Sequence, residues 1–185
     1  MRKLEASLFI SLDGVVESPD QWQFNVFDND MMTAMTNQLA GQDAFLLGRV
    51  SYQEWTSYWP TSTDEPFATI INQTPKYVVS TTLDKVEWGK WDNVTLIKGN
   101  LAEEITRLKQ QPGKNSGIGS SPTLVRSLLY DGLLDELTLL YHPVVVGKGK
   151  RLFNDGDELK RLKLVNSKVT SSGVAILTYQ PNPNA

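Results

Sequence analysis

The sequence predicts a single α/β domain with a mixed, mostly parallel central sheet, helices on both faces and an antiparallel C-terminal hairpin. Over the first two-thirds of the 185 residues, short apolar runs of strand type alternate with helical patterns, which is typical of parallel sheets. The last third shows strand patterns only. Because no internal repeat or linker interrupts the chain, we expect residues 1–180 to form one domain and residues 181–185 a frayed tail.

The composition is that of an ordinary globular protein, and it narrows the possible functions. The formal net charge of −3 argues against a nucleic-acid-binding protein, which normally carries a basic surface. The chain has no cysteine and a single histidine, His142, so we expect neither disulfides nor a metal site. No signal peptide or membrane span is visible in the sequence, and we therefore expect a cytoplasmic protein that does not bind membranes.

The N-terminal part begins with a strand over residues 4–11, where apolar side chains alternate with the others. Residues 15–28 have no clean period but contain aromatic residues. This segment predicts either a flap over a pocket or a loop that buries its aromatic residues on its own body. A helix follows, with Asn29 or Asp30 as its N-cap, a stripe of methionines, and Gly41 at its end.

The middle of the chain repeats the order of strand and helix. The run at residues 44–47 is too apolar for a half-exposed strand and predicts a central strand covered on both faces. A helix begins at Ser51 and stops at Pro60. We expect further strands at residues 77–79 and 94–97 and at Ile118, and further helices over 66–72, from Leu101 to Leu108 with a Glu103–Arg107 pair, and from Ser121 as N-cap to a stop at Gly132.

The last third predicts a strongly apolar strand over residues 136–146 and a closing hairpin formed by residues 162–171 and 174–179. The apolar segment 137–146 could also form a contact in a homodimer. His142 lies within it and is more simply explained as a structural histidine than as a catalytic one.

Three of the predicted strands end in glycine or hydroxyl residues, at Gly48-Arg49, Ser80-Thr81 and Gly119-Ser120-Ser121. Ligands of open α/β sheets bind beyond the carboxyl ends of parallel strands. Backbone N–H groups at helix N-termini bind phosphate, and an arginine suits a further phosphate. The sequence contains neither a G-x-G-x-x-G nor a P-loop motif, so ordinary turns with a surface arginine are an equally open interpretation of these junctions.

Several stretches together resemble the dihydrofolate reductase-like superfamily, in particular its bacterial branch similar to the C-terminal reductase domain of the bifunctional riboflavin biosynthesis protein. The stretches occur in family order along nearly the whole chain. They are Ser11-Leu12-Asp13-Gly14, Leu46-Leu47-Gly48-Arg49-Val50-Ser51-Tyr52, Val78-Val79-Ser80, residues 119–134 and residues 142–153.

The resemblance implies NADPH as hydride donor and gives roles to individual residues. It implies Gly48, Arg49, Val50 and Ser51 at the cofactor phosphates, Ser80 and Thr81 at the adenosine 2′-phosphate, and Gly119, Ser120 and Ser121 beside the pyrophosphate and nicotinamide. Ser120 stands where the family carries a glycine. The loop after Asp13 would be a mobile flap over the nicotinamide, and Asp13, Trp22 and Asp30 are candidate substrate-binding residues. Asp13 could equally serve only to form its turn.

We therefore expect an NADPH-dependent reductase of a small heterocycle, similar to the 5-amino-6-(5-phosphoribosylamino)uracil reductase of riboflavin biosynthesis. A pterin reductase of the dihydrofolate reductase type is disfavoured because Met31, Met32 and Met35 occupy the helix that carries the pterin-binding carboxylate in those enzymes, and Asp30 lies a turn too early. The sequence is also compatible with a non-catalytic nucleotide-binding homodimer and with a purely structural domain. No catalytic residue is assigned, since hydride transfer relies mainly on the cofactor.

Overall fold

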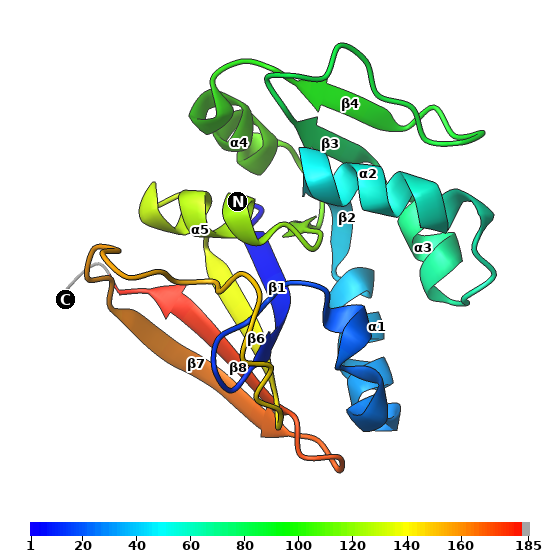
Figure 1. Ribbon diagram of the computed structural model, residues 1–185. Coiled ribbons are helices and arrows are strands. Elements are labelled where there is room, and N and C mark those ends of the chain that lie inside the picture. Colours follow the sequence, from blue (N-terminus) through cyan, green and yellow to red (C-terminus); the bar gives the residue numbers. More distant parts are fainter. Residues whose placement is uncertain (183–185) are drawn as a thin grey trace.

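The computed structural model describes residues 1–182 and shows one eight-stranded sheet with the strand order β4-β3-β2-β5-β1-β6-β8-β7 (Figure 1). The strands are β1 Leu4–Ser11, β2 Gln42–Gly48, β3 Lys76–Val79, β4 Val94–Ile97, β5 Asn115–Ile118, β6 Glu136–His142, β7 Leu162–Val169 and β8 Ala175–Pro181. The α-helices are α1 Asn29–Ala40, α2 Arg49–Tyr58, α3 Phe67–Gln73, α4 Leu101–Gln110 and α5 Pro122–Tyr130, with 3-10 turns at Pro19–Gln21, Phe24–Val26 and Trp59–Thr61. The predicted fold class is confirmed.

The sheet is covered on both faces, as the apolar run in β2 predicts. Figure 1 shows α1, α2 and α3 on one side of the sheet and α4 and α5 on the other. Leu46 of β2 packs in the same apolar cluster as α4 and α5 residues. Its neighbours Phe45 and Leu47 pack in a second cluster with Tyr52 of α2 and Ile71 of α3. A strand buried on both faces is therefore an unbroken apolar run rather than an alternating one.

The register of the parallel strands decides where their carboxyl ends lie. β2 pairs in parallel with β3 and β5, so Gly48 lies opposite Val79 and Leu46 lies opposite Ile118. The three junctions singled out in the sequence directly follow these strands. The fold therefore brings them to neighbouring positions on one edge of the sheet.

β6 is shorter than the sequence pattern predicts, because it ends at His142 and not at residue 146. Pro143 has no N–H for a strand ladder, and the N–H of Val144 donates to the carbonyl of His142 in a tight turn. β6 lies between β1 and β8 in the interior of the sheet. Leu137, Leu139 and Leu140 are buried in the core of this one chain. This part of the segment is therefore not available for the homodimer contact.

Two further local predictions are wrong, and a third is confirmed with different bounds. Asp28, not Asn29 or Asp30, is the N-cap of α1, since its carboxylate accepts a hydrogen bond from the N–H of Met31. Arg107 pairs with Glu104 rather than with Glu103, whose carboxylate accepts a bond from the Asn100 side chain instead. The hairpin of β7 and β8 is confirmed as antiparallel, but β8 extends to Pro181, which pairs with Leu162. Of the predicted tail, residues 183–185 lie outside the described residues.

Candidate active site

Two helices on opposite faces of the sheet begin at the edge where β2 and β5 end. α2 starts at Arg49 after Gly48, and α5 starts at Pro122 after Ser121. Neither helix has a side-chain cap on its first turn. The first N–H groups of a helix lack partners within the helix and carry its positive dipole end. This edge therefore offers two N-termini to an anion.

Ser51 and Ser121 join the two helix starts. The Ser121 hydroxyl lies 2.8 Å from the Ser51 hydroxyl, to which it donates, and 3.0 Å from the carbonyl oxygen of Gly119. It also accepts a hydrogen bond of 2.8 Å from the N–H of Gly48. Ser51 donates in turn to the carbonyl of Ser120. Both serines are buried, so in this conformation their hydroxyls hold the edge together. Ser121 is the N-cap residue of α5, as predicted, but its hydroxyl makes these contacts and does not cap the helix.

Gly119 and Ser120 show why small residues occur after β5. A Cβ on Gly119 would lie 2.6 Å from Cη2 of Trp55 and 2.7 Å from Cδ2 of Leu47, closer than such atoms can approach. Ser120 has a φ of 42°, in the left-handed region that favours glycine. The serine therefore adopts the backbone conformation for which a glycine is best suited, and its departure from the family glycine leaves that conformation in place.

Arg49, Val50 and Thr81 are exposed at the same edge, whereas Ser80 is buried. The Arg49 guanidinium contacts only Gln53, at 3.4 Å, among the hydrogen bonds of the described chain, so it can reach a ligand. The Ser80 hydroxyl accepts bonds from the N–H groups of Thr82 and Leu83. It shapes the turn after β3, and the exposed hydroxyl of Thr81 is the more accessible of the two.

Asp13 ties the loop after β1 to the loop after β6. Its carboxylate accepts hydrogen bonds from the N–H groups of Val146 and Gly147, at 3.0 and 2.9 Å, and from the Ser11 hydroxyl at 2.7 Å. These bonds, the one from Ser11 first, lower the pKa of Asp13 to about 2. The carboxylate thus remains ionised and is committed to holding the base of the flap, which favours the turn-forming interpretation over substrate binding.

Trp22 of residues 15–28, the segment that the sequence predicts as a flap or a self-packed loop, covers the end of β6. The Trp22 ring meets the His142 ring edge-on, with centroids 5.3 Å apart, and its indole N–H donates to the carbonyl of Glu17 at 3.2 Å. β1 and β6 pair in parallel so that Ser11 lies opposite His142. Trp22 therefore lies at the same carboxyl edge of the sheet as the two helix N-termini.

Helix α1, which contains Asp30 and the methionines, begins at the margin of this edge. The Asp30 carboxylate accepts bonds from the N–H and hydroxyl of Ser171, at 2.9 and 2.6 Å, and from Lys168 at 3.3 Å. The bonds from Ser171, followed by the one from Lys168, lower the pKa of Asp30 to about 2. Met31 is completely buried against the apolar cluster of Leu140 and Val174. Asp30 thus anchors α1 to the turn between β7 and β8, and Met31 is core.

The sequence gives no sign of one feature of this edge. His142 is completely buried, and its Nε2 has no hydrogen-bond partner among the described residues. The sequence pattern shows an apolar strand around His142 and therefore indicates a satisfied structural histidine. Only the fold shows that one of its two ring nitrogens has no hydrogen-bond partner among the described residues.

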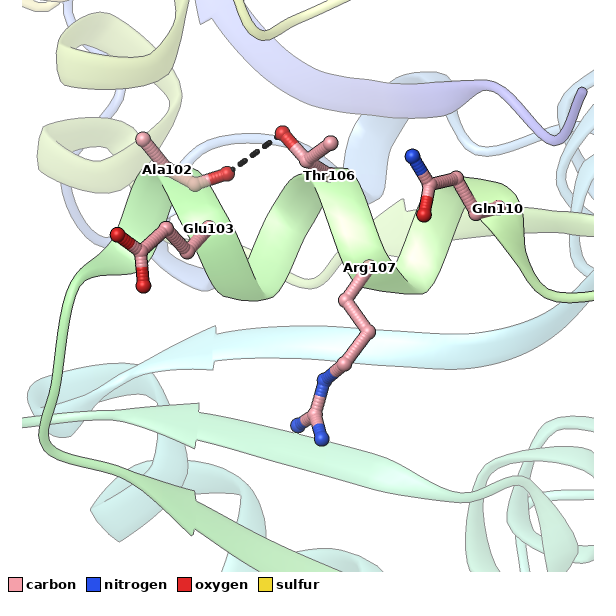
Figure 2. A pocket seen from close by; sticks show the side chains of 5 residues that line it. All are labelled: Ala102, Glu103, Thr106, Arg107 and Gln110. Carbon is pink, nitrogen blue, oxygen red and sulfur yellow. Dashed lines mark hydrogen bonds between the residues drawn. The ribbon is translucent and has the colours of Figure 1, made fainter.

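Other parts of the described chain are weaker candidates for a functional site. A shallow depression on the outside of α4 is lined by side chains of that helix alone, namely Ala102, Glu103, Thr106, Arg107 and Gln110 (Figure 2). Across residues 1–182, no cluster of acidic, histidine or cysteine side chains could hold a metal ion. None of the helices in this range is both long and apolar enough to cross a membrane.

The fold is that of the dihydrofolate reductase-like α/β domains. A dihydrofolate reductase from Enterococcus faecalis, solved in complex with NADP(H) and RAB-propyl, shares the fold with a TM-score of 0.64 and 16% identity over 97% of this chain and 96% of its own. A protein from Shewanella sp. PV-4 that is named for riboflavin biosynthesis superposes with a TM-score of 0.80, at 23% identity over 97% and 99% of the two chains. At these identities the likeness shows the fold.

The family is shown by the sequence match. Residues 2–176 match the model of the RibD C-terminal domain, and the chain belongs to this family, which is of reductase type. A relative from Bacillus subtilis (strain 168), the uncharacterized protein YyaP, is 33% identical over 98% of this chain and 96% of its own length. The predicted resemblance is therefore confirmed, while the roles of individual site residues stay predictions.

Proposed function

We propose that the protein is an NADPH-dependent reductase of a small nitrogen heterocycle of the aminopyrimidine type. One observation carries the proposal: two uncapped helix N-termini, coupled by Ser51 and Ser121, lie at one edge with an exposed arginine, Arg49. Such an edge suits the pyrophosphate of a dinucleotide, and a guanidinium suits the extra 2′-phosphate that distinguishes NADPH from NADH. Family membership and a fold shared with an NADP(H) complex support the same cofactor.

The residues present fit such a cofactor by their chemistry. The N–H groups of the first turns of α2 and α5 would bind the phosphates, and Arg49 and Thr81 would bind the 2′-phosphate. Gly119 is required by the packing beneath this edge, because a Cβ there would lie 2.6 Å from Trp55 and 2.7 Å from Leu47. NADPH, when bound, supplies the hydride. The protein's part is to align the acceptor carbon with it and to exclude water with the flap.

A pterin substrate has less support. Met31 is buried in the core, and both carboxylate oxygens of Asp30 accept bonds from the β7–β8 segment. An aminopyrimidine related to 5-amino-6-(5-phosphoribosylamino)uracil is therefore our choice of substrate class. We keep the homodimer and the cytoplasmic location as predictions. Sedimentation of the purified protein tests the homodimer.

Thermal unfolding with NADPH and with NADH tests the proposed cofactor. A ligand that binds only the folded state stabilises it by mass action, by about 2.7 kcal/mol at a hundredfold excess over Kd. We expect NADPH to raise the melting temperature more than NADH does. Oxidation of NADPH with 5,6-diaminouracil, compared with dihydrofolate, tests the substrate class. Equal stabilisation by the two nucleotides contradicts the role of the 2′-phosphate, and no stabilisation by either contradicts the proposed function.

A further inference from the structure

His142 uses only one of its two ring nitrogens. Nδ1 lies 2.8 Å from the carbonyl oxygen of Leu140. A carbonyl can only accept a hydrogen bond, so Nδ1 carries the proton and Nε2 of the neutral ring presents a lone pair. Burial lowers the pKa of His142, which favours this neutral form. Nε2 is therefore a hydrogen-bond acceptor, and no described residue donates to it.

The surroundings of this acceptor are aromatic. Phe9 of β1 and Trp22 of the flap each meet the imidazole edge-on, with ring centroids 5.3 Å away. The only N–H of the Trp22 side chain is directed to Glu17. A buried acceptor without a donor costs free energy, and a ligand that donates a hydrogen bond to it would recover that cost on binding.

The flap contains a second acceptor of this kind. Gln23 follows Trp22 directly, and its Oε1 is buried without a partner. Within residues 1–182 only four buried side-chain polar atoms lack a partner. Two of them thus belong to the flap and to the strand end that the flap covers. Both are acceptors, so each can be satisfied only by a hydrogen-bond donor.

The position of His142 relates this acceptor to the candidate cofactor edge. Ser11 of β1 lies opposite His142 of β6. β1 also pairs in parallel with β5, which leads into Gly119 and Ser120. The carboxyl ends of β5, β1 and β6 are therefore consecutive along one edge. Ile118 of β5 lies opposite Ala6, five residues before Ser11, so His142 lies further along β1 than the cofactor edge. A substrate that lies along residues 7–11 of β1 would have the cofactor edge at one end and His142 at the other.

We propose that His142 Nε2 binds the substrate, by accepting a hydrogen bond from a ring N–H or an amino group of an aminopyrimidine that displaces Trp22. The proposal rests on the proposed function for the place of the cofactor, but it concerns a different group and a different ligand. His142 then selects heterocycles that carry N–H donors, and Trp22 covers the acceptor when no substrate is present.

The single histidine makes a direct test possible, because the imidazole nitrogens of the full chain give one set of NMR signals. We would titrate the ¹⁵N-histidine-labelled protein with 5,6-diaminouracil, with and without NADPH. The free protein should show the Nδ1–H tautomer. The diaminouracil should then shift the Nε2 resonance saturably, whereas 1,3-dimethyluracil, which has no N–H donor, should leave it in place.

Two substitutions separate the acceptor from the space it fills. His142→Phe retains an aromatic ring without an acceptor and should weaken diaminouracil binding by about tenfold, the equivalent of one hydrogen bond. His142→Gln places an amide oxygen near the position of Nε2 and should weaken it less. Stabilisation by NADPH should be the same in both variants as in the unaltered protein.

Each result of these experiments supports or overturns the role of His142. An Nε2 signal that stays fixed while diaminouracil binds overturns the proposal, and so does undiminished binding by His142→Phe. Failure of diaminouracil to bind at all overturns it as well, because the substrate class is then wrong. If NADPH still stabilises the protein in that case, the cofactor part of the proposed function survives. The NMR experiment needs no variant, so a His142→Phe protein that fails to fold leaves the test intact.

Discussion

The hydroxyl of Ser121 lies 2.8 Å from the hydroxyl of Ser51, and this contact joins the first turns of two helices that cover opposite faces of the sheet. The same Ser121 oxygen accepts the N–H of Gly48, the last residue of β2. One buried side chain therefore connects the ends of β2 and β5 with the starts of α2 and α5. Serine is small enough to lie there, since a Cβ on Gly48 would already be 3.3 Å from its oxygen.

Ser121→Ala should destabilise the protein and weaken NADPH binding. The substitution leaves the Gly48 N–H without its acceptor, which costs about 1–2 kcal/mol and lowers the melting temperature by about 2–8 °C. Ser127→Ala on the exposed side of the same helix is the matched control and should change neither quantity. Thermal unfolding with and without NADPH measures both effects. An unaltered melting temperature would show that the Ser51–Ser121 contact has no energetic role.

Arg49→Ala should separate the two nicotinamide cofactors. The guanidinium is exposed and can form a charge-assisted bond with a 2′-phosphate, so its loss should weaken NADPH binding by about ten- to a hundredfold. NADH lacks that phosphate, and its affinity should change little. Titration of each nucleotide measures the two affinities. Arg107→Ala on α4 removes another exposed arginine and serves as control. An equal loss for both nucleotides would contradict the role given to Arg49.

The order of strands and helices could be predicted because burial leaves its mark on local sequence. The uninterrupted apolar run of β2 indicates a strand covered on two faces, and the alternation in β1 indicates a strand. Parallel strands have their carboxyl ends at one edge, so the convergence of the Gly48, Ser80 and Gly119 junctions could be predicted as well. These properties depend on few residues that are close in sequence.

Contacts between distant segments could not be predicted in this way. From the sequence, Asp13 could either form a turn or bind substrate. The partners that decide between these roles are the N–H groups of Val146 and Gly147, more than 130 residues away. The unused acceptor of His142 depends on the position of Trp22. The Glu103–Arg107 pair failed for a local reason, because Asn100 competes for the Glu103 carboxylate. Side-chain partners follow from the three-dimensional packing, which periodicity does not describe.

Gly119→Ala tests whether the end of β5 needs a residue without a side chain. The new methyl group would lie 2.6 Å from Trp55 and 2.7 Å from Leu47, and the backbone or the Trp55 ring must shift to accept it. Overpacking of this kind costs about 1–3 kcal/mol. Gly99→Ala is the control, because no atom lies within 4 Å of a Cβ at that position. Urea unfolding compares the two. If both variants were equally stable, the close packing around Gly119 would have no consequence.

Lys76 should make the stability of the protein depend on pH. The side chain is 1% exposed, its Nζ donates to the carbonyl of Asn72 at 2.9 Å, and it lies 4.5 Å from the centroid of the Trp88 ring. Burial lowers the pKa of Lys76 from 10.5 to about 7. Between these values the unfolded chain binds more protons than the folded one, so the free energy of unfolding should rise with pH. Below pH 7 both states are protonated and this contribution is constant.

Lys76→Met should remove that dependence and stabilise the protein at neutral pH, where the buried ammonium is least favourable. We expect the difference between the unaltered protein and the variant to shrink by about 2–4 kcal/mol from pH 7 to pH 10 in urea unfolding. Lys90→Met is the control, because Lys90 also lies over a tryptophan, 4.9 Å from the ring centroid of Trp91, but is exposed. Comparing each variant with the unaltered protein removes the contribution of the tyrosines to the free energy of unfolding, because all three proteins contain the same tyrosines. A difference that stays constant over this range would mean that Lys76 is solvated in the folded state and that its pKa is close to its usual value.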